Sequence, residues 1–327
     1  MPAPTYTETL NELYATTWAL RKPEVVDQIF TATPFFYLMK KNGRMETMEG
    51  GRWIEHPVNY AKNETTTFIG KGGNVTLAAT DTVTTTHWDW KYLTGHIIRY
   101  FADFQKNRGK AQLIQRVNHD IDVLRNSLID ECETALWGDG TGDGSLAYDG
   151  LGNIIANTNT NTVGGLSGTT YSWWRNQTKN MSGEAASVYL IKRMRTMFND
   201  CGKYGEGVFR FPDHIVGAQD VYELYEEETL EIGRILMGDK KMADLGFGEL
   251  AFKGRPITWS PAATAGELKF LNTSVLKWVS DPIGDFELGE WLPIVDQPRD
   301  VVAHTMSVGN MVTSNRRRLG AMYNIAE

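Results

Sequence analysis

Hydrophobic residues recur every three or four positions between residues 110 and 137, and this spacing predicts the longest helix of the chain. The apolar stripe consists of Leu113, Ile114, Val117, Ile121, Leu124, Leu128, Cys132 and Ala135. At 1.5 Å per residue the helix is about 40 Å long. We expect it to end at the glycine-rich run 138–144, because no helix tolerates such a run.

A different pattern covers residues 46–100 and is typical of one long hairpin. Its two predicted strands, 52–60 and 83–100, are rich in β-branched and aromatic residues. The connection at 62–81 is polar and threonine-rich, and it contains a glycine-rich tip around Lys71. Two strands bury little on their own, so a hairpin of this length is expected to lie on a neighbouring molecule.

Aromatic residues of this hairpin are the first candidates for that contact. Alternation along the second strand places Trp88, Trp90 and Tyr92 on one face, where their own hairpin is not expected to cover them. With Trp53 and the tip residue Lys71, they form the predicted assembly interface.

The rest of the chain mixes helices and strands and predicts an α+β fold. We expect helices at 185–201 and 219–228, and strands at 208–216, 250–259, 268–272, 275–279 and, twice, within 301–326. No internal repeat or low-complexity linker divides the chain.

Composition indicates an ordinary folded protein, with 41% hydrophobic and 22% charged residues in 327. The net charge of -7 argues against a broad basic face that grips nucleic acid. Two cysteines, Cys132 and Cys201, predict buried packing and a reducing cytoplasm. Neither a signal peptide nor a membrane-spanning helix is expected.

Candidate chemical sites are weak. Asp139, Asp143 and Asp149 lie in an oxygen-rich loop of the kind that holds calcium, but the EF-hand spacing is absent and a plain turn explains the run. The six histidines lack zinc-site spacing, and no phosphate-binding or nucleophile-elbow motif occurs. The sequence therefore predicts no catalytic, cofactor-binding or metal site and no cofactor.

Two charged clusters have alternative readings. The acidic residues Glu223, Glu226, Glu227, Glu228 and Glu231 are carboxylates of the kind used in sugar hydrolysis, yet their helical spacing favours a solvated helix face. Arg316, Arg317 and Arg318 can contact phosphate or pair across a subunit interface, and we favour the interface.

The order of these elements resembles the major capsid proteins of tailed phages, the Hong Kong 97 fold, over essentially the whole chain. The segments 136–142 and 252–257 look like recurring segments of that family. The resemblance implies an N-terminal arm (1–45), an extended loop (46–104), a peripheral lobe (105–149 and 296–327) built on the long helix as its spine, and an axial α/β lobe (150–295).

The same resemblance implies a non-enzymatic subunit that self-assembles as pentamers and hexamers into an icosahedral shell around double-stranded DNA. Scaffolding, portal and decoration proteins would be separate partners, and no scaffolding segment is expected upstream of the arm. Some family members join a loop lysine to a neighbour's asparagine. Lys71 is the counterpart by position, but no matching asparagine is found, so this chemistry is not carried over.

We expect assembly in the host cytoplasm and a final location in the virion. Two alternatives stay open at this point. One is an encapsulin-like compartment with the same architecture, and the other is a carbohydrate-active enzyme.

Overall fold

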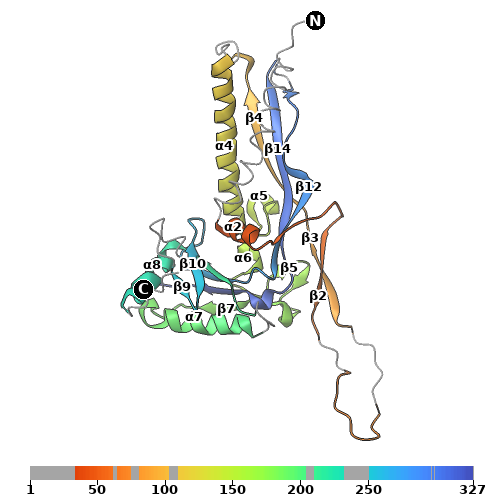
Figure 1. The fold of residues 1–327 in the computed structure, drawn as a ribbon, viewed down its shortest axis with the longest axis vertical. Helices are drawn as coiled ribbons and strands as arrows, with labels where there is room; N and C mark the ends of the chain where they lie inside the picture. Colours follow the sequence, from red (N-terminus) through yellow and green to blue (C-terminus); the bar gives the residue numbers. More distant parts are fainter. Residues whose placement is uncertain are drawn as a thin grey trace.

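The computed structural model describes residues 34–61, 65–74, 81–102, 110–203, 210–231, 250–295, 297 and 299–326. Two sheets organise these residues, and the long helix α4 (Lys110–Trp137) stands beside one of them (Figure 1). The predicted α+β class and the bounds of the long helix are confirmed. Most of the predicted N-terminal arm lies outside the described residues, which begin at α2 (Pro34–Lys41).

The first sheet, called the long sheet here, is centred on β14 (Val301–Thr313). One edge of β14 pairs antiparallel with β4 (Lys91–Arg99), and the other pairs with β12 (Leu276–Leu288) and β13 (Leu292–Pro293). The short β1 (Met45–Thr47) runs parallel to β12. Residues at alternate positions at the start of β14 are buried, as the period of a strand requires.

The spine helix α4 packs on β4 through its predicted apolar stripe. Ile121, Leu124, Leu128 and Cys132 are buried, whereas the side chains of residues 110–118 lie outside the described part of the structure. Gly95 of β4 permits the close approach, because a Cβ there would come within 2.6 Å of Leu124 Cδ1. Burial raises the pKa of the Cys132 thiol to about 12, in agreement with the packing role predicted for it.

The second sheet has six strands in the order β7-β15-β11-β8-β10-β9. Its strands are β7 (Gln177–Asn180), β15 (Gly320–Tyr323), β11 (Leu268–Leu271), β8 (His214–Gly217), β10 (Arg255–Trp259) and β9 (Ala251–Phe252). The helices α7 (Ala186–Gly202) and α8 (Gln219–Glu231) pack on it, and Cys201 is buried there as predicted. Both helices begin within one residue of their predicted starts.

Sheet membership differs from the predicted lobe boundaries. The strands β12 and β13 fall inside the predicted axial range 150–295 but belong to the long sheet, whereas β15 falls inside the predicted peripheral range 296–327 but belongs to the six-stranded sheet. The reason is that strand partners are distant in sequence, so a cut at one residue cannot separate two interleaved sheets.

The long hairpin is also shorter than predicted. Its strands β2 (Ile54–Asn59) and β3 (Val83–Trp88) pair antiparallel, from Ile54 opposite Trp88 to Asn59 opposite Val83. After Asp89 and Trp90 the chain leaves this pair, and β4 joins β14 instead. The predicted second strand, 83–100, is therefore two strands in two different sheets.

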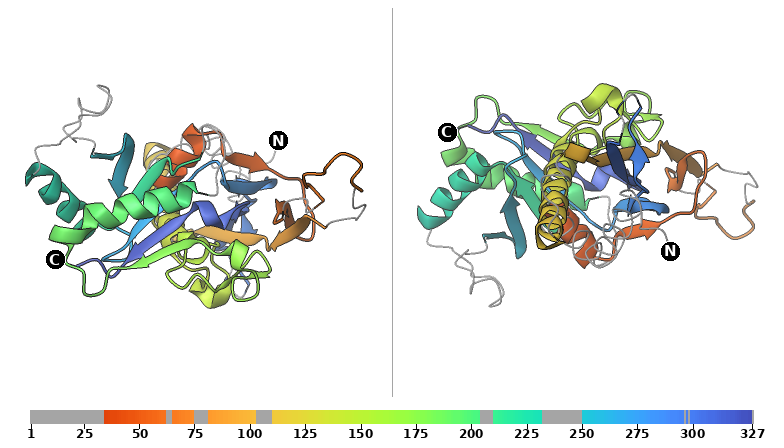
Figure 2. Two further views of the ribbon diagram at one scale, coloured as in Figure 1. Left: turned by 90° about the horizontal axis from the view of Figure 1, so that it is seen from below. Right: turned by 90° about the horizontal axis from the view of Figure 1, so that it is seen from above.

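Short elements complete the chain. They are α5 (Gly142–Ser145), α6 (Leu151–Ile154), β5 (Thr162–Val163), β6 (Leu166–Ser167), η1 (Ser172–Trp174) and η4 (Arg316–Arg318). Both views in Figure 2 place the lobe with α7 and α8 and the hairpin of β2 and β3 on opposite sides of the molecule. Within the described residues, every helix is too short or too polar to cross a membrane.

Candidate assembly surfaces

The stem of the extended loop is fixed to the chain's own body. Trp88, predicted to need a neighbour's cover, is only 2% exposed. Its ring fills a notch at Gly164, where a Cβ would lie 2.9 Å from the indole, and the His87 amide donates to the Gly164 carbonyl over 3.0 Å. Our prediction that Trp88 awaits another subunit is therefore wrong, because the β5–β6 turn covers it.

The tip of the same loop has no such cover. Phe68 is 105% exposed and Ile69 is 55% exposed, and Lys71 is exposed beside them. A turn closed by the Gly73 amide, which donates to the Gly70 carbonyl, shapes the tip. Figure 1 shows this segment extending away from both sheets. An apolar pair in water at the end of a long loop is the surface that association would most readily bury.

The other predicted aromatic residues occupy intermediate environments. Trp53 is 36% exposed, with the Arg52 guanidinium 4.3 Å from its ring centroid and the His87 ring at 5.5 Å. Trp90 is half-buried and donates from Nε1 to the Gly51 carbonyl. These contacts fix the indoles within the subunit and leave part of the Trp53 surface available.

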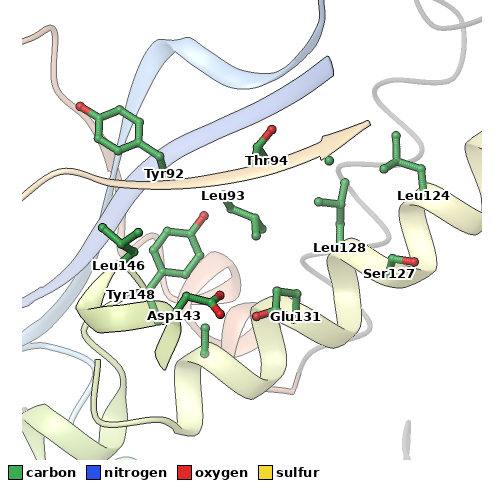
Figure 3. Close-up of a pocket in the computed structure, with 13 residues that line it drawn as sticks. Tyr92, Leu93, Thr94, Leu124, Ser127, Leu128, Glu131, Asp143, Leu146 and Tyr148 are labelled. Carbon is green, nitrogen blue, oxygen red and sulfur yellow. The ribbon is translucent and has the colours of Figure 1, made fainter. Parts of the chain in front are cut away.

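Tyr92 is the outermost of the three residues predicted to share a face, at 63% exposed. It stands on β4 at the mouth of a groove of about 450 Å³ between β4 and α4 (Figure 3). The groove is mostly apolar, with Leu93, Leu128 and Leu146 among its lining residues, and the carboxyl groups of Glu131 and Asp143 lie near each other between Leu146 and Leu128. This groove, which our sequence reasoning missed, is a second apolar surface on the long-sheet side.

The three consecutive arginines are separated by the fold. Arg316 is 0% exposed: its Nε donates to the Ile154 carbonyl, and its Nη2 donates to the side-chain oxygens of Asn161 and Asn176. Desolvation lowers its pKa to about 10. The predicted interface role is thus wrong for Arg316, which is an internal hub of a 3₁₀ turn rather than part of a strand.

Arg317 and Arg318 are half-buried and stay candidates for an interface. Two side-chain nitrogens of Arg318, Nε and Nη2, are buried without a hydrogen-bond partner among the described residues. Desolvation lowers the pKa of Arg318, while the nearby Asp213 carboxylate acts in the opposite direction.

Two of the three aspartates of the predicted calcium loop, Asp139 and Asp149, accept internal hydrogen bonds, and Asp143 is exposed. Asp139 accepts from the Thr141 amide and hydroxyl, which lowers its pKa. Asp149 accepts from the side-chain amides of Asn153 and Asn310 and so ties α6 to β14. Across the part of the chain that the structure describes, no group of three or more histidine, cysteine or acidic side chains is placed to hold a metal ion.

The five acidic residues of α8 differ in exposure: Glu228 is half-buried, and the side chain of Glu231 lies outside the described part of the structure. Glu223, Glu226 and Glu227 are exposed along the helix, as the solvated-face interpretation predicts. Carboxylates that hydrolyse a glycoside flank their substrate at a fixed separation inside a cleft, and none of the three lines a described groove. The geometry therefore gives the carbohydrate-active alternative no support.

The fold defined by these two sheets, the spine helix and the protruding loop is the Hong Kong 97 fold of shell-forming capsid proteins. The chain is similar to the capsid subunit of cyanophage A-1(L), with a TM-score of 0.66, 15% identity, and coverage of 87% of this chain and 91% of that chain. It is also similar to the capsid of a native GTA particle, with a TM-score of 0.56, 13% identity, and coverage of 87% and 89%.

An encapsulin shares the fold as well. The SrpI encapsulin complex from Synechococcus elongatus matches with a TM-score of 0.55, 10% identity, and coverage of 88% of this chain and 87% of that chain. No protein-family model matches the sequence. No curated protein matches it by sequence either.

Proposed function

We propose that the chain is a major capsid protein, the repeated non-enzymatic subunit of an icosahedral phage head that encloses double-stranded DNA. The likeness to capsid subunits over 87% of this chain supports this class. In this proposal the long sheet with α4 is the peripheral lobe, the six-stranded sheet with α7 and α8 is the axial lobe, and copies associate as pentamers and hexamers.

One observation carries the proposal: the loop is anchored at its stem and uncovered at its tip. Trp88 holds the stem against Gly164, whereas Phe68 at the tip is fully exposed in the single subunit. Burying one such aromatic side chain contributes about 2 kcal/mol. A shell repeats that contact many times, so a modest gain per copy yields a durable particle.

The finer partners follow from the proposed class. We expect separate scaffolding, portal and decoration proteins, assembly in the host cytoplasm, and DNA enclosed without sequence-specific contacts. A net charge of -7 is in keeping with a wall along which DNA can move.

The experiment that tests the proposal uses the full chain expressed in bacteria. Size-exclusion chromatography and negative-stain microscopy are expected to reveal rings or closed particles. A chain that stays a 36.8 kDa monomer at all accessible concentrations, with or without a scaffolding protein, would end the proposal.

An encapsulin-like compartment is the second candidate, and the similarity to the SrpI encapsulin is compatible with it. The contents of particles purified from their native source separate the two. Genomic double-stranded DNA that resists nuclease until the shell is opened indicates a phage head, whereas a single enriched protein cargo indicates a compartment.

A further inference from the structure

We infer that the acidic outer face of α8 in one copy docks on a basic surface formed by α7 and Lys253 in the next copy. This inference rests on the proposed function, because it names the contact that would join axial lobes within a ring. The basic surface consists of Lys192, Arg195 and Lys253, and the acidic surface consists of Glu223, Glu226 and Glu227.

The basic surface gathers like charges that no described carboxylate neutralises. Lys192 and Arg195 are exposed and lie about one turn apart on α7. Lys253 reaches the same helix, because its ammonium donates to the Asn199 side chain over 3.0 Å and lies 4.8 Å from the Phe198 ring centroid. Desolvation and then the charge of Arg195 lower the pKa of Lys253, as expected for neighbouring cations.

The backbone at Lys253 adds an independent observation. Residues 253 and 254 form the turn between β9 and β10, and both have positive φ, 51° for Lys253 and 74° for Gly254. Such a two-residue turn favours asparagine at its first position, because other side chains are strained there. The conformation of the turn therefore disfavours lysine at position 253. We attribute the presence of Lys253 to the positive charge that it places beside α7.

The acidic surface is the electrostatic counterpart. Glu223 is separated from Glu226 and Glu227 by three and four positions, so the three exposed carboxylates stand together on α8. Like charges at this spacing repel and weaken a helix. Glu223 accepts a hydrogen bond from Gln219, but none of the three forms an ion pair with another described residue.

In the proposed contact, the acidic surface and the basic surface come from two different copies of the chain. Both helices pack on the six-stranded sheet, with α7 along its lower side and α8 at the end far from the hairpin (Figure 1). Within one copy no described ion pair joins the two surfaces. A head-to-tail contact brings opposite charges together once per copy, and such contacts close a ring when the rotation between copies is right.

Charge reversal tests the contact. Two variants, E223K/E227K and K192E/R195E, each place like charges against each other, and we expect at least about a tenfold loss of rings at low salt. The quadruple variant carries both changes and restores the complementarity with its sign inverted. We expect it to recover most of the parent's yield, which makes it a matched control for the number and position of the substitutions.

The variant K253N distinguishes an effect of the Lys253 charge on ring assembly from an effect on the stability of the subunit. Asparagine suits the turn better than lysine, so the thermal midpoint of the subunit is expected to stay equal or rise while ring yield falls. Ring yield of the parent should also fall as salt increases, because exposed charges are screened within about 8 Å at physiological ionic strength.

The outcomes distinguish this inference from the proposed function. A parent chain that forms no assembly contradicts the function itself. A parent that assembles, together with reversed variants that assemble equally well, overturns only the inference. A quadruple variant that folds by circular dichroism but fails to recover assembly does the same.

Discussion

At the scale of single residues, Arg316 shows how a charge becomes part of a core. Its guanidinium donates to backbone and asparagine oxygens, with no carboxylate among its hydrogen-bond partners in the described residues, and burial lowers its pKa. The turn that holds it connects β14 of the long sheet to β15 of the six-stranded sheet. Arg316 therefore fixes the loop around Asn161 and Asn176 to the crossing between the two sheets.

Replacing Arg316 by alanine should lower the free energy of unfolding by about 3 kcal/mol, because three acceptors, two of them on buried residues, lose their donor. Urea denaturation of the subunit measures the change. The control is Arg317→Ala: this residue is half-buried, and we expect about 1 kcal/mol or less. Equal effects of the two substitutions would contradict the assignment of Arg316 as the internal hub.

A second residue-scale prediction concerns His214 on β8. Burial lowers its pKa to about 4 from an ordinary value of 6.5, and its Nε2 contacts the Thr258 hydroxyl. Below pH 6.5 the unfolded chain therefore binds a proton at this histidine that the folded chain does not bind. The contribution of neutral His214 to the free energy of unfolding is fully present above pH 6.5 and is lost as the pH falls toward 4. At about pH 4 and below, the free energy of unfolding is lower by about 3 kcal/mol for this reason.

The measurement compares the free energy of unfolding of the parent and of His214→Gln between pH 4.5 and pH 7. Glutamine keeps a donor for Thr258 but has no proton to gain, so its profile should be flatter. Burial raises the pKa of the adjacent Asp213, which acts in the opposite direction, and the comparison between the two proteins removes that contribution. Parallel profiles would refute the role of His214.

At the scale of elements, the contact between α4 and β4 depends on one missing side chain. Gly95 lies against Leu124, Leu128 and the methyl group of Thr305. Valine at this position would push the spine helix away from the long sheet, and we expect a loss of about 3 kcal/mol in unfolding free energy. Thermal denaturation checks this. Gly70→Ala, where an added Cβ meets nothing, is the matched control and should change stability little.

The helices were predictable because their apolar periodicity is local. The long helix, its glycine-rich end and the starts of α7 and α8 all follow from spacing within a few turns. Strand pairing was not predictable in this way, because β4 pairs with β14, which lies about two hundred residues later in the chain. The alternating stretch 83–100 contains no signal at Asp89 and Trp90 that tells where one sheet ends and the other begins.

The residues of the candidate surfaces were also predictable only in part. Exposure of Lys71 and Tyr92 agrees with the sequence pattern, while the burial of Trp88 depends on a glycine turn that looked like an ordinary loop. The pair Gly164-Gly165 was the available signal, because adjacent glycines mark a place where a large side chain can approach the backbone. Nothing local to the arginine run distinguished Arg316 from its neighbours.

At the scale of the whole molecule, the exposed tip is the part of the proposed subunit that we expect a neighbouring copy to cover. The variant Phe68→Ser/Ile69→Ser should leave the fold and thermal midpoint of the free subunit unchanged, since neither side chain packs on its own body. Assembled particles should dissociate at a lower temperature or denaturant concentration, with about 2 kcal/mol lost per tip. Lys71→Ala at the same tip is the control for apolar burial.

Light scattering during heating gives the particle midpoint, and circular dichroism gives that of the subunit. Particles of the serine variant that survive as long as those of the parent would show that the tip stays in water in the shell.

The placement of β14 and β15 also bears on synthesis. One strand lies in the middle of the long sheet, and the other lies between β7 and β11. A nascent polypeptide that stops before residue 301 lacks an interior member of both sheets, so neither lobe can close around its core. If the chain is the shell subunit proposed above, truncated products would be unable to join a growing particle, and only completely translated chains would assemble.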